Sequence, residues 1–384
     1  MTGSRSPGAR ARPGAARGKS RTACWRCLRR SWLIAELSPQ LDYVYADRAR
    51  LLALLALGDA ELIAALAGRR RDELRERHAR FARRAADPGG GVRAICRHDR
   101  SYASALRAAS APHMLFVEGA AEAFCELDRG ALVAIAGSTR ASDYGREVGR
   151  ALARGLAASG VAVAGALRDG IGAAALAGAA EVRGRAVCVA PGGLALAVSA
   201  RHRRLAERFL RSGCALSELP PGASGRRWGH AAGERIIAAL AQVTVMVEAH
   251  DTPRELAPAW MAHTLGRSVA AVPGRVTSPL SAGTHALLAG GAQLVRGASD
   301  VLELLGRRAP PVGPTSDSGP GGPDRLSPQL QQLLARVGAG EDTPDRLTAG
   351  AKDAGSVLLA LSELEAMGLL ARGDNGRYVP TLGA

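Results

Sequence analysis

Residues 132–150 have the sequence LVAIAGSTRASDYGREVGR, and this stretch decides the fold class. Five apolar, strand-forming positions lead into a turn at Gly137, and a helical apolar repeat that includes Val148 and Leu152 begins near Asp143. A strand that turns at a glycine into an amphipathic helix is one unit of a parallel sheet.

The same alternation of short apolar runs and helical stretches continues from about residue 110 to 305. The helical stretches include Tyr144–Ala157 and Ala200–Leu210. We expect six strands, at Leu132–Ala136, Val161–Ala164, Ala186–Ala190, Ala215–Ser217, Val243–Val247 and Val269–Val272. Strands that alternate with helices form a parallel, doubly wound sheet, so the predicted core over residues 93–306 is a Rossmann-like α/β domain.

Segments of different composition flank this core. Residues 1–22 predict a disordered basic tail, and residues 23–92 predict an N-terminal helical (SAM-like) module in which Asp59 is the N-cap of a helix. Residues 307–325 are a Pro/Gly linker, and residues 326–384 predict three helices and a β-hairpin, with Val357, Leu358, Leu361 and Leu364 facing inward. This last pattern favours a winged-helix domain; the alternative is an α/β interaction module that does not touch DNA.

Basic residues are concentrated near the N-terminus. The formal net charge is +16, and residues 1–100 account for +12 of it. Almost all of the basic residues are arginine, since lysine occurs only at Lys19 and Lys352. Two explanations of this composition stay open. One is a codon bias toward Arg, Ala and Gly, and the other is an anionic binding partner.

Membrane and secreted proteins are excluded by simple patterns. No run of 18 apolar residues occurs, and the basic first 20 residues lack the apolar segment of a secretory signal. We therefore expect a cytoplasmic protein with reduced thiols. Cys24 and Cys27 form a CxxC motif, but no second pair follows at zinc spacing and Cys96 and Cys125 stand alone, so we expect no metal site.

Glycine-opened turns follow several predicted strands. Because the carboxyl ends of parallel strands meet at one crevice, these turns are expected to lie together. Backbone amides, hydroxyl groups and arginines there would form an anion cradle suited to phosphate. The first turn lacks the spacing GxGxxG, so a nicotinamide-binding loop is not expected. For Gly165 and Gly170, the alternative is that they only shape a tight turn.

The order of the motifs then suggests a family. The motifs are Val133–Ser138 with Tyr144-Gly145-Arg146, Ser217-Glu218 with Pro220-Pro221-Gly222, Arg235-Ile236-Ile237, Val247-Glu248-Ala249, and Val272-Pro273-Gly274 with Gly283. In this order and spacing over residues 93–305, the chain resembles the DprA/Smf family of DNA-processing proteins.

The resemblance implies a non-enzymatic protein that binds single-stranded DNA, forms a homodimer and hands the strand to the RecA recombinase during natural transformation. It implies no cofactor. The DNA- and phosphate-binding residues predicted on this basis are Gly137, Ser138, Arg140, Gly165, Gly170, Arg235, Glu248, Gly274, Ser278 and Gly283.

Several positions depart from the family pattern. Thr139 displaces Arg140 by one place, and an anionic Glu234 precedes Arg235. Further departures are Ala164, Gly172, Leu176, Gly233 and the segment His250–Glu255. Two alternatives therefore stay open. One is a hydrolase of a nucleotide or phosphoribosyl ligand, with Glu218 and Glu248 as its carboxylates, and the other is a scaffold protein whose DNA site has decayed.

Overall fold

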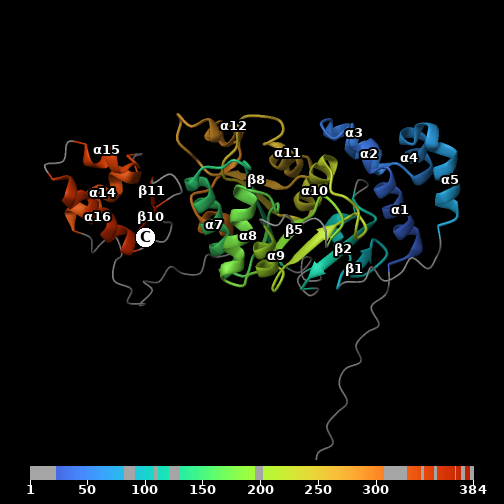
Figure 1. Cartoon of the computed structure of the whole chain (residues 1–384), viewed down its shortest axis with the longest axis horizontal. Coiled ribbons are helices and arrows are strands. Elements are labelled where there is room, and N and C mark those ends of the chain that lie inside the picture. The colour runs from blue at the N-terminus through green and yellow to red at the C-terminus, as the bar shows by residue number, and fades with distance from the viewer. Residues whose placement is uncertain are drawn as a thin grey trace, which may run out of the picture.

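The structure is a computed structural model that describes residues 23–81, 91–107, 111–120, 124, 130–194, 202–306, 327–338, 341–349, 353–367, 369–372 and 377–380. Figure 1 shows a central sheet with its helices, an N-terminal group of helices on one side and a small C-terminal unit on the other. The predicted tail (1–22) and linker (307–325) lie outside the described residues. Within the described ranges, no helix combines the length and apolarity that a membrane span requires.

The core is a nine-stranded sheet with the strand order β1-β2-β6-β5-β4-β3-β7-β8-β9. Its strands are β1 (Arg93–Cys96), β2 (Met114–Gly119), β3 (Leu132–Ala136), β4 (Ala162–Ala164), β5 (Ala186–Val189), β6 (Cys214–Ser217), β7 (Val243–Met246), β8 (Ser268–Ala271) and β9 (Gln293–Leu294). In the part of the sheet with the order β6-β5-β4-β3-β7-β8-β9, all neighbouring strands pair in parallel, as predicted. All six predicted strands are present, and their ends differ from the predicted ends by no more than one residue.

Three strands were missed by the sequence analysis. β1 and β2 form an antiparallel edge, in which β2 pairs with β6. β1 is short and begins at the exposed Arg93, and both residues of β9 are exposed. β1 and β9 therefore lack the continuous apolar run of a doubly covered parallel strand and leave a weak pattern in the sequence. β2 does contain such a run, at Met114–Val117, and was missed in spite of it.

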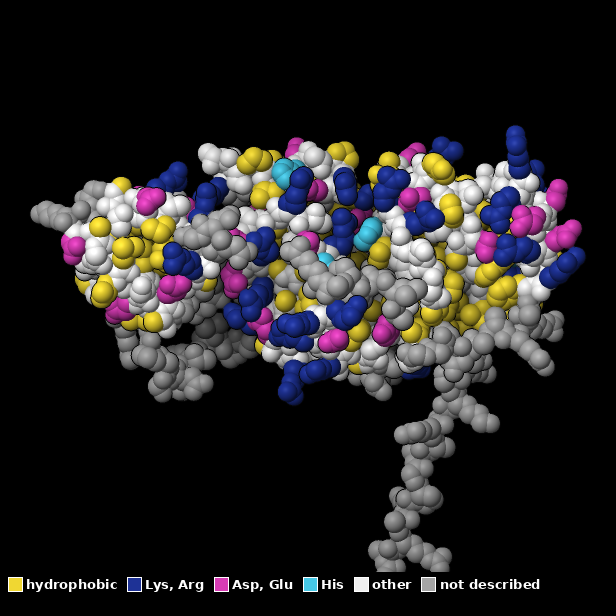
Figure 2. All heavy atoms as spheres, viewed as in Figure 1, with side chains coloured by type: hydrophobic (Ala, Val, Ile, Leu, Met, Phe, Trp, Pro, Cys, Tyr) yellow, Lys and Arg dark blue, Asp and Glu magenta, His cyan; other side chains and the backbone are white. Residues whose placement is uncertain are grey.

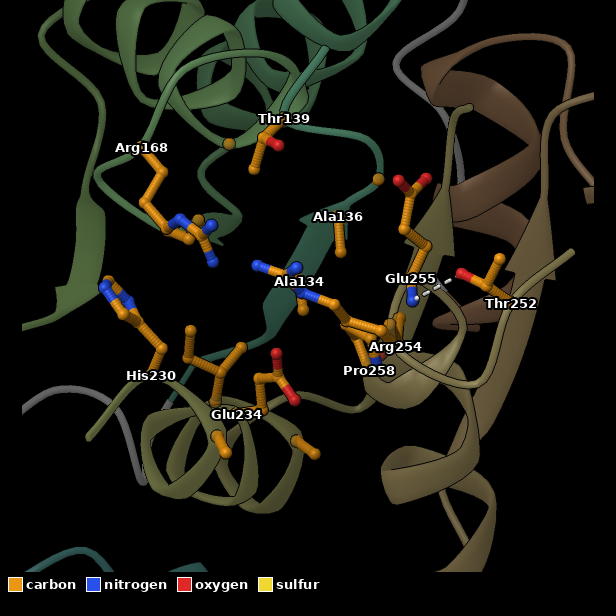
Figure 3. A pocket seen from close by; sticks show the side chains of 18 of the residues that line it. Ala134, Ala136, Thr139, Arg168, His230, Glu234, Thr252, Arg254, Glu255 and Pro258 are labelled. Atoms are coloured by element: carbon orange, nitrogen blue, oxygen red, sulfur yellow. Dashed lines mark hydrogen bonds between the residues drawn. The ribbon is translucent and has the colours of Figure 1, made fainter. Parts of the chain in front are cut away.

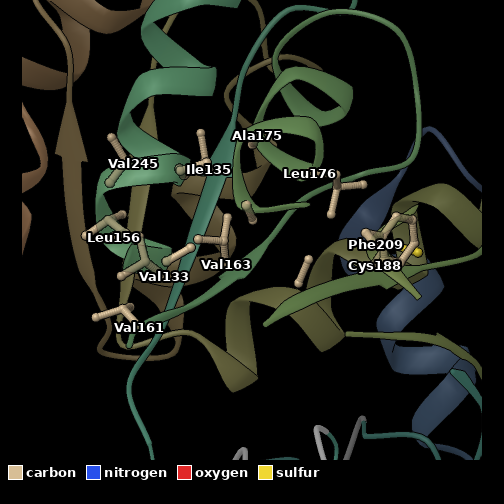
Figure 4. Packing of buried hydrophobic residues seen from close by; sticks show 14 of the residues in the cluster. Val133, Ile135, Leu156, Val161, Val163, Ala175, Leu176, Cys188, Phe209 and Val245 are labelled. Carbon is tan, nitrogen blue, oxygen red and sulfur yellow. The ribbon is translucent and has the colours of Figure 1, made fainter. Parts of the chain in front are cut away.

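Helices cover both faces of the sheet. They are α7 (Asp143–Ala158), α8 (Ile171–Glu181), α9 (Arg203–Phe209), α10 (Arg227–Leu240), α11 (Ala257–Thr264), α12 (Ala282–Ala289) and α13 (Ala298–Leu304), with short 3-10 turns at Ser104–Leu106 and Pro279–Ser281. Successive side chains of β3 point to opposite faces. Val133 and Ile135 pack with α7 and α8, as Figure 4 shows, and Leu132 and Ala134 pack with α10.

The N-terminal helices pack against α10. They are α1 (Trp25–Glu36), α2 (Ser38–Leu41), α3 (Arg48–Ala56), α4 (Asp59–Leu66) and α5 (Arg71–Ala79), with a 3-10 turn at Gly68–Arg70. Trp228 of α10 is fully buried among them, and its indole N–H donates to Ser38 Oγ at 2.7 Å. The predicted capping role of Asp59 is wrong. Gly58 is the N-cap of α4, and the Asp59 carboxylate instead pairs with Arg30 at 2.9 Å.

The C-terminal unit has its own small core. It contains α14 (Pro328–Gly338), α15 (Pro344–Thr348), α16 (Ala354–Ala366) and the antiparallel pair β10 (Leu370–Arg372) and β11 (Tyr378–Pro380). Leu361 and Leu364 are buried, as predicted, but Leu358 is 44% exposed. The prediction for Leu358 is wrong because successive helical residues are rotated by about 100°. Val357 packs against the core, and Leu358, the next residue, therefore lies beside the buried stripe that includes Leu361.

Candidate functional site

The candidate site lies where the order of strands along the sheet reverses. β3 has β4 on one side and β7 on the other. The chain leaves β3 for α7 on one face and leaves β7 for α11 on the other face. Diverging loops at such a switch point leave a crevice beyond the carboxyl ends of the strands, which is where open α/β sheets bind ligands.

Close backbone packing shapes the edge of this crevice. The Ser138 amide donates to the Glu248 carbonyl at 2.6 Å, which ties the loop after β3 to the loop after β7. A Cβ at Gly137 would lie 2.5 Å from that carbonyl oxygen. Gly170 has φ +83°, and a Cβ there would lie 2.1 Å from the Ser138 carbonyl oxygen. Both positions therefore require glycine.

The crevice opens into a cavity of about 1290 Å³. Ala134, Ala136 and Thr244 of the central strands line it, and so do His230 and Glu234 of α10. Figure 3 labels Ala134, Ala136, His230 and Glu234 together with side chains from the loops after β4 and β7. The N-terminal helical module also reaches the cavity, through Tyr45 and Arg48. The site is therefore assembled from the core and the module together.

Cationic side chains outnumber anionic ones around the cavity. Five arginines line it, at positions 48, 140, 168, 227 and 254, against three carboxylates at positions 169, 234 and 255. Arg48 pairs with Glu234 at 2.7 Å, and Arg227 pairs with Asp42 at 3.3 Å. In the part of the chain that the structure describes, the other three arginines have no carboxylate partner.

These three arginines, Arg140, Arg168 and Arg254, carry the excess charge. Figure 3 shows the guanidinium groups of Arg168 and Arg254 extending into the cavity from opposite loops. In the face drawn in Figure 2, basic side chains gather over the middle of the molecule. Their charges are thus directed into and around the cavity, where a polyanion would be attracted.

The titratable groups of the cavity respond to burial and to this charge. Burial, followed by repulsion from Arg254, lowers the pKa of the Arg168 guanidinium. Burial and the two arginines lower the pKa of His230 to about 4. Burial also raises the pKa of Glu234 to about 7, and the nearby Arg48 only partly offsets this effect. Near neutral pH, His230 is therefore uncharged and Glu234 is only partly ionised.

A buried hydroxyl group completes the site. Thr244 is 1% exposed, lines the cavity, and its Oγ1 makes no hydrogen bond to any described residue. Leaving such a group unpaired costs free energy. A ligand with a polar atom at the floor of the cavity would recover that free energy.

Gly137, Arg140 and Gly165 line the cavity, in agreement with their predicted position. Arg235 does not line the cavity, so the DNA-binding role predicted for it has no support in its position. Its side chain is 5% exposed and pairs with the buried Glu218, with Nη2 to Oε2 at 2.6 Å. Arg235 also donates from Nη1 to the Ala232 carbonyl at 2.6 Å. It is thus a structural cation of the core.

Glu248 is likewise a structural residue rather than part of the cavity lining. It is 6% exposed, and its carboxylate accepts hydrogen bonds from the Ser142 amide at 2.8 Å and the Ser142 hydroxyl at 2.6 Å. Ser142 is the N-cap of α7. Glu248 therefore fixes the start of α7 against the end of β7.

The remaining predicted residues support the site from outside it. Ser138 and Gly170 lie in the packed loops at its edge and do not line the cavity. Gly274 and Ser278 belong to the loop after β8, Gly283 lies in the first turn of α12, and all three lie outside the lining. The Gly283 amide donates to the Ala249 carbonyl at 2.9 Å, so the start of α12 supports the segment that carries Arg254.

Arg254, His230, Thr244 and Arg48 are among the cavity residues that the sequence analysis did not single out. Arg254 lies in the segment 250–255, which departs from the family pattern, and its position in the loop after β7 was the available signal. Arg48 comes from another part of the fold and left no such signal.

The expectation that Cys96 stands alone is also wrong. Cys96 lies with Cys24, Cys27 and His98 in one cluster, whose potential ligand atoms are all within 4.8 Å of one another. Cys27 lies in α1 and Cys96 in β1, and the helices α2 to α5 separate them in the chain. Their proximity therefore depends on the fold and not on local spacing.

Comparisons with known proteins define the class to which this fold and site belong. The family model for DNA recombination-mediator protein A matches residues 93–306, which is more than half of the chain. The chain belongs to the DprA/Smf family of DNA processing proteins.

Individual relatives agree with this assignment. A DprA relative from Mycobacterium tuberculosis is 38% identical over 248 residues, and the match covers 64% of this chain and 63% of the relative. Protein Smf of Escherichia coli is 33% identical over 270 residues, covering 69% of this chain and 71% of that protein. The crystal structure of DprA from Streptococcus pneumoniae has a TM-score of 0.57 and 25% identity, over 72% of this chain and 95% of that one.

Proposed function

We propose that this chain binds single-stranded DNA across the cavity at the switch point, with backbone phosphates contacting Arg140, Arg168 and Arg254. The observation that carries the proposal is a set of three arginines that have no carboxylate partner among the described residues and lie beside glycine-opened strand ends. Such groups bind phosphate through charge-assisted hydrogen bonds. Because the chain belongs to a family of recombination mediators, DNA is the polyanion that we expect it to bind.

The protein acts as a mediator and not as an enzyme. The two carboxylates that the sequence offered for a hydrolase, Glu218 and Glu248, are committed to Arg235 and to Ser142. They are buried outside the cavity lining. In this proposal the protein protects the incoming strand, works as a homodimer in the cytoplasm and hands the DNA to the RecA recombinase.

The predicted domain division is part of the same proposal. Residues 23–92 form the helical module, residues 93–306 form the DNA-processing core, and residues 326–384 form a winged-helix domain behind the linker 307–325. The three helices and the antiparallel β10–β11 pair support the winged-helix assignment. Its presumed recognition helix, α16, carries Glu363 and Glu365, so the core is expected to provide most of the DNA affinity.

Fluorescence polarisation with a labelled oligothymidylate tests the proposal. The affinity of the parent protein should fall as salt rises, because bound phosphates release counterions. Arg168→Ala and Arg254→Ala should each weaken binding about tenfold and reduce the salt slope by about 0.7. Arg204→Ala, an exposed change on α9 outside the cavity lining, is the matched control and should bind like the parent. Binding without a salt slope, or equal losses in all three variants, would reject the proposal.

A small phosphorylated nucleotide is the second candidate ligand, and the unpaired Thr244 hydroxyl is the observation that favours it. A cavity of about 1290 Å³ is large enough for such a molecule. Isothermal titration with nucleoside mono- and triphosphates tests this candidate. Saturable binding that Thr244→Val abolishes, together with no displacement by the oligonucleotide, would favour the nucleotide over DNA.

A further inference from the structure

Four soft or borderline metal ligands meet where the N-terminal helical module joins the sheet. Cys24 is the N-cap of α1, and Cys27 lies in the first turn of that helix. Cys96 is the last residue of β1, and His98 follows in the adjoining turn. Two segments that are about 70 residues apart in the chain, each with two ligands, are therefore brought face to face.

The spacing of the ligand atoms fits a single tetrahedral ion. His98 Nδ1 lies 3.4 Å from Cys24 Sγ, 3.4 Å from Cys27 Sγ and 4.0 Å from Cys96 Sγ. All four ligand atoms lie within 4.8 Å of one another. Tetrahedral zinc with Zn–S near 2.3 Å and Zn–N near 2.05 Å places sulfur and nitrogen about 3.5 Å apart, and two sulfurs about 3.8 Å apart.

Hydrogen bonding alone does not explain this arrangement. One imidazole nitrogen either donates a single N–H or accepts at a single lone pair, so it satisfies one sulfur and not three. Three sulfurs around one ring nitrogen are instead the ligand shell of a central cation. The spacing is also too close for an iron–sulfur cluster, whose several atoms hold the cysteine sulfurs farther apart.

The surroundings suit a closed structural site. Cys27 and Cys96 are 2% and 3% exposed, and they pack in the main core with Ala23, Val92 and Met114. Cys24 is half-buried and His98 is exposed at the rim. Three cysteines and one histidine fill all four positions of tetrahedral zinc, which leaves none for a substrate or a reactive water.

We propose that Cys24, Cys27, Cys96 and His98 bind a structural Zn²⁺ ion that fastens α1 of the helical module to the end of β1. Binding requires the thiolate form of the cysteines and a neutral histidine whose Nδ1 faces the ion. The ion closes a loop of about 70 residues, so it stabilises the docking of the helical module on the sheet.

Metal analysis of the full-length protein tests the site. The protein is produced with zinc in the medium, purified in the presence of a reductant, and assayed for zinc by mass spectrometry. We expect about one zinc per chain in the parent. Cys96→Ser and His98→Ala should each lower the zinc affinity by more than about tenfold. Cys188→Ala changes a buried cysteine in β5 that lies outside the Cys24/Cys27/Cys96/His98 cluster, and should keep the zinc.

Cobalt substitution and a rescue variant keep the proposal testable if a cysteine variant fails to fold. Co²⁺ in the parent should give the absorption of a tetrahedral thiolate site, and this absorption should be lost in His98→Ala. His98→Cys should restore metal binding, since four cysteines also hold zinc. Zinc removal by a chelator should lower the temperature of unfolding in the parent and in Cys188→Ala, but not in His98→Ala.

Other outcomes would overturn the proposal. They are a reduced parent protein without stoichiometric zinc, no tetrahedral Co²⁺ spectrum, or equal zinc loss in Cys188→Ala. A disulfide between Cys24 and Cys27 in freshly purified protein, with no bound metal, would assign the CxxC motif to redox chemistry instead. None of these measurements depends on DNA binding, so the zinc site and the proposed function can fail separately.

Discussion

Replacing Arg235 with alanine tests whether this residue stabilises the core or binds DNA. Arg235 and Glu218 are 5% and 7% exposed, and they form two hydrogen bonds, at 3.2 and 2.6 Å. Arg235→Ala removes the cation and leaves the Glu218 carboxylate buried without its partner. The stability of the core should therefore fall, while the affinity for DNA of the protein that remains folded should not change.

The structure allows the size of this loss to be worked out. Breaking a buried ion pair by removing one partner costs about 3–5 kcal/mol, because the remaining charge stays desolvated. In a core of 150–250 residues, each kcal/mol corresponds to about 2–4 °C in Tm, so the transition should fall by roughly 10 °C. Replacing both residues, as in Arg235→Met with Glu218→Leu, removes the unpaired charge and should recover most of the stability.

Urea unfolding and oligonucleotide polarisation measure the two effects separately. Binding is measured below the unfolding transition of the variant, where Arg235→Ala should match the parent within about twofold, since the side chain makes no phosphate contact. The reasoning is refuted if Arg235→Ala unfolds at the same urea concentration as the parent but binds the oligonucleotide ten times more weakly. In that case the guanidinium group would face DNA.

Three further perturbations test the cavity and its frame. Glu234 has a pKa raised to about 7, so it loses its negative charge as pH falls, and the oligonucleotide should bind more tightly at pH 6 than at pH 8. Glu234→Gln should remove most of this pH dependence. If the affinity of Glu234→Gln changes with pH as much as that of the parent, Glu234 is not responsible. Ser142→Ala removes the N-cap of α7 and should cost about 1–2 kcal/mol in urea unfolding, with the exposed change Arg204→Ala as a neutral control. Gly170→Ala forces a side chain toward the Ser138 carbonyl at a φ of +83° and should cost more than about 1 kcal/mol by the same measurement; parent-like stability would show that the loop can relax.

The fold was predictable because parallel strands are covered on both faces. Such strands are continuous apolar runs, and Val133–Ile135 or Val243–Val245 stand out from the helical periodicity around them. The antiparallel edge is different. In β1 only Ile95 and Cys96 are buried, and this run is too short to mark a strand, whereas the buried run of β2 was overlooked.

The site was only partly predictable, because a motif does not say which way a helical side chain points. Glu234 and Arg235 are neighbours on α10, and about 100° of rotation separates them. Glu234 lines the cavity and Arg235 turns to Glu218 in the core. Gly137 was easier to place, because a glycine directly after a strand lies at the strand's carboxyl end in any parallel sheet.

Long-range pairs explain the remaining misses. Arg48 reaches Glu234 from another module, and Cys96 reaches Cys27 across most of the first hundred residues. Spacing rules recognise ligands that are close in sequence, and they do not recognise residues that only tertiary packing brings together.

The ion pair between Arg48 and Glu234 makes the helical module a participant in the electrostatics of the cavity. A shortened protein that began at β1 would retain the sheet and Arg140, Arg168 and Arg254, but the counterion of Glu234 would be gone. That carboxylate would then either take up a proton or oppose an incoming phosphate, according to pH. The pH dependence of DNA binding by such a core would therefore differ from that of the longer chain, in which Arg48 favours the ionised form of Glu234.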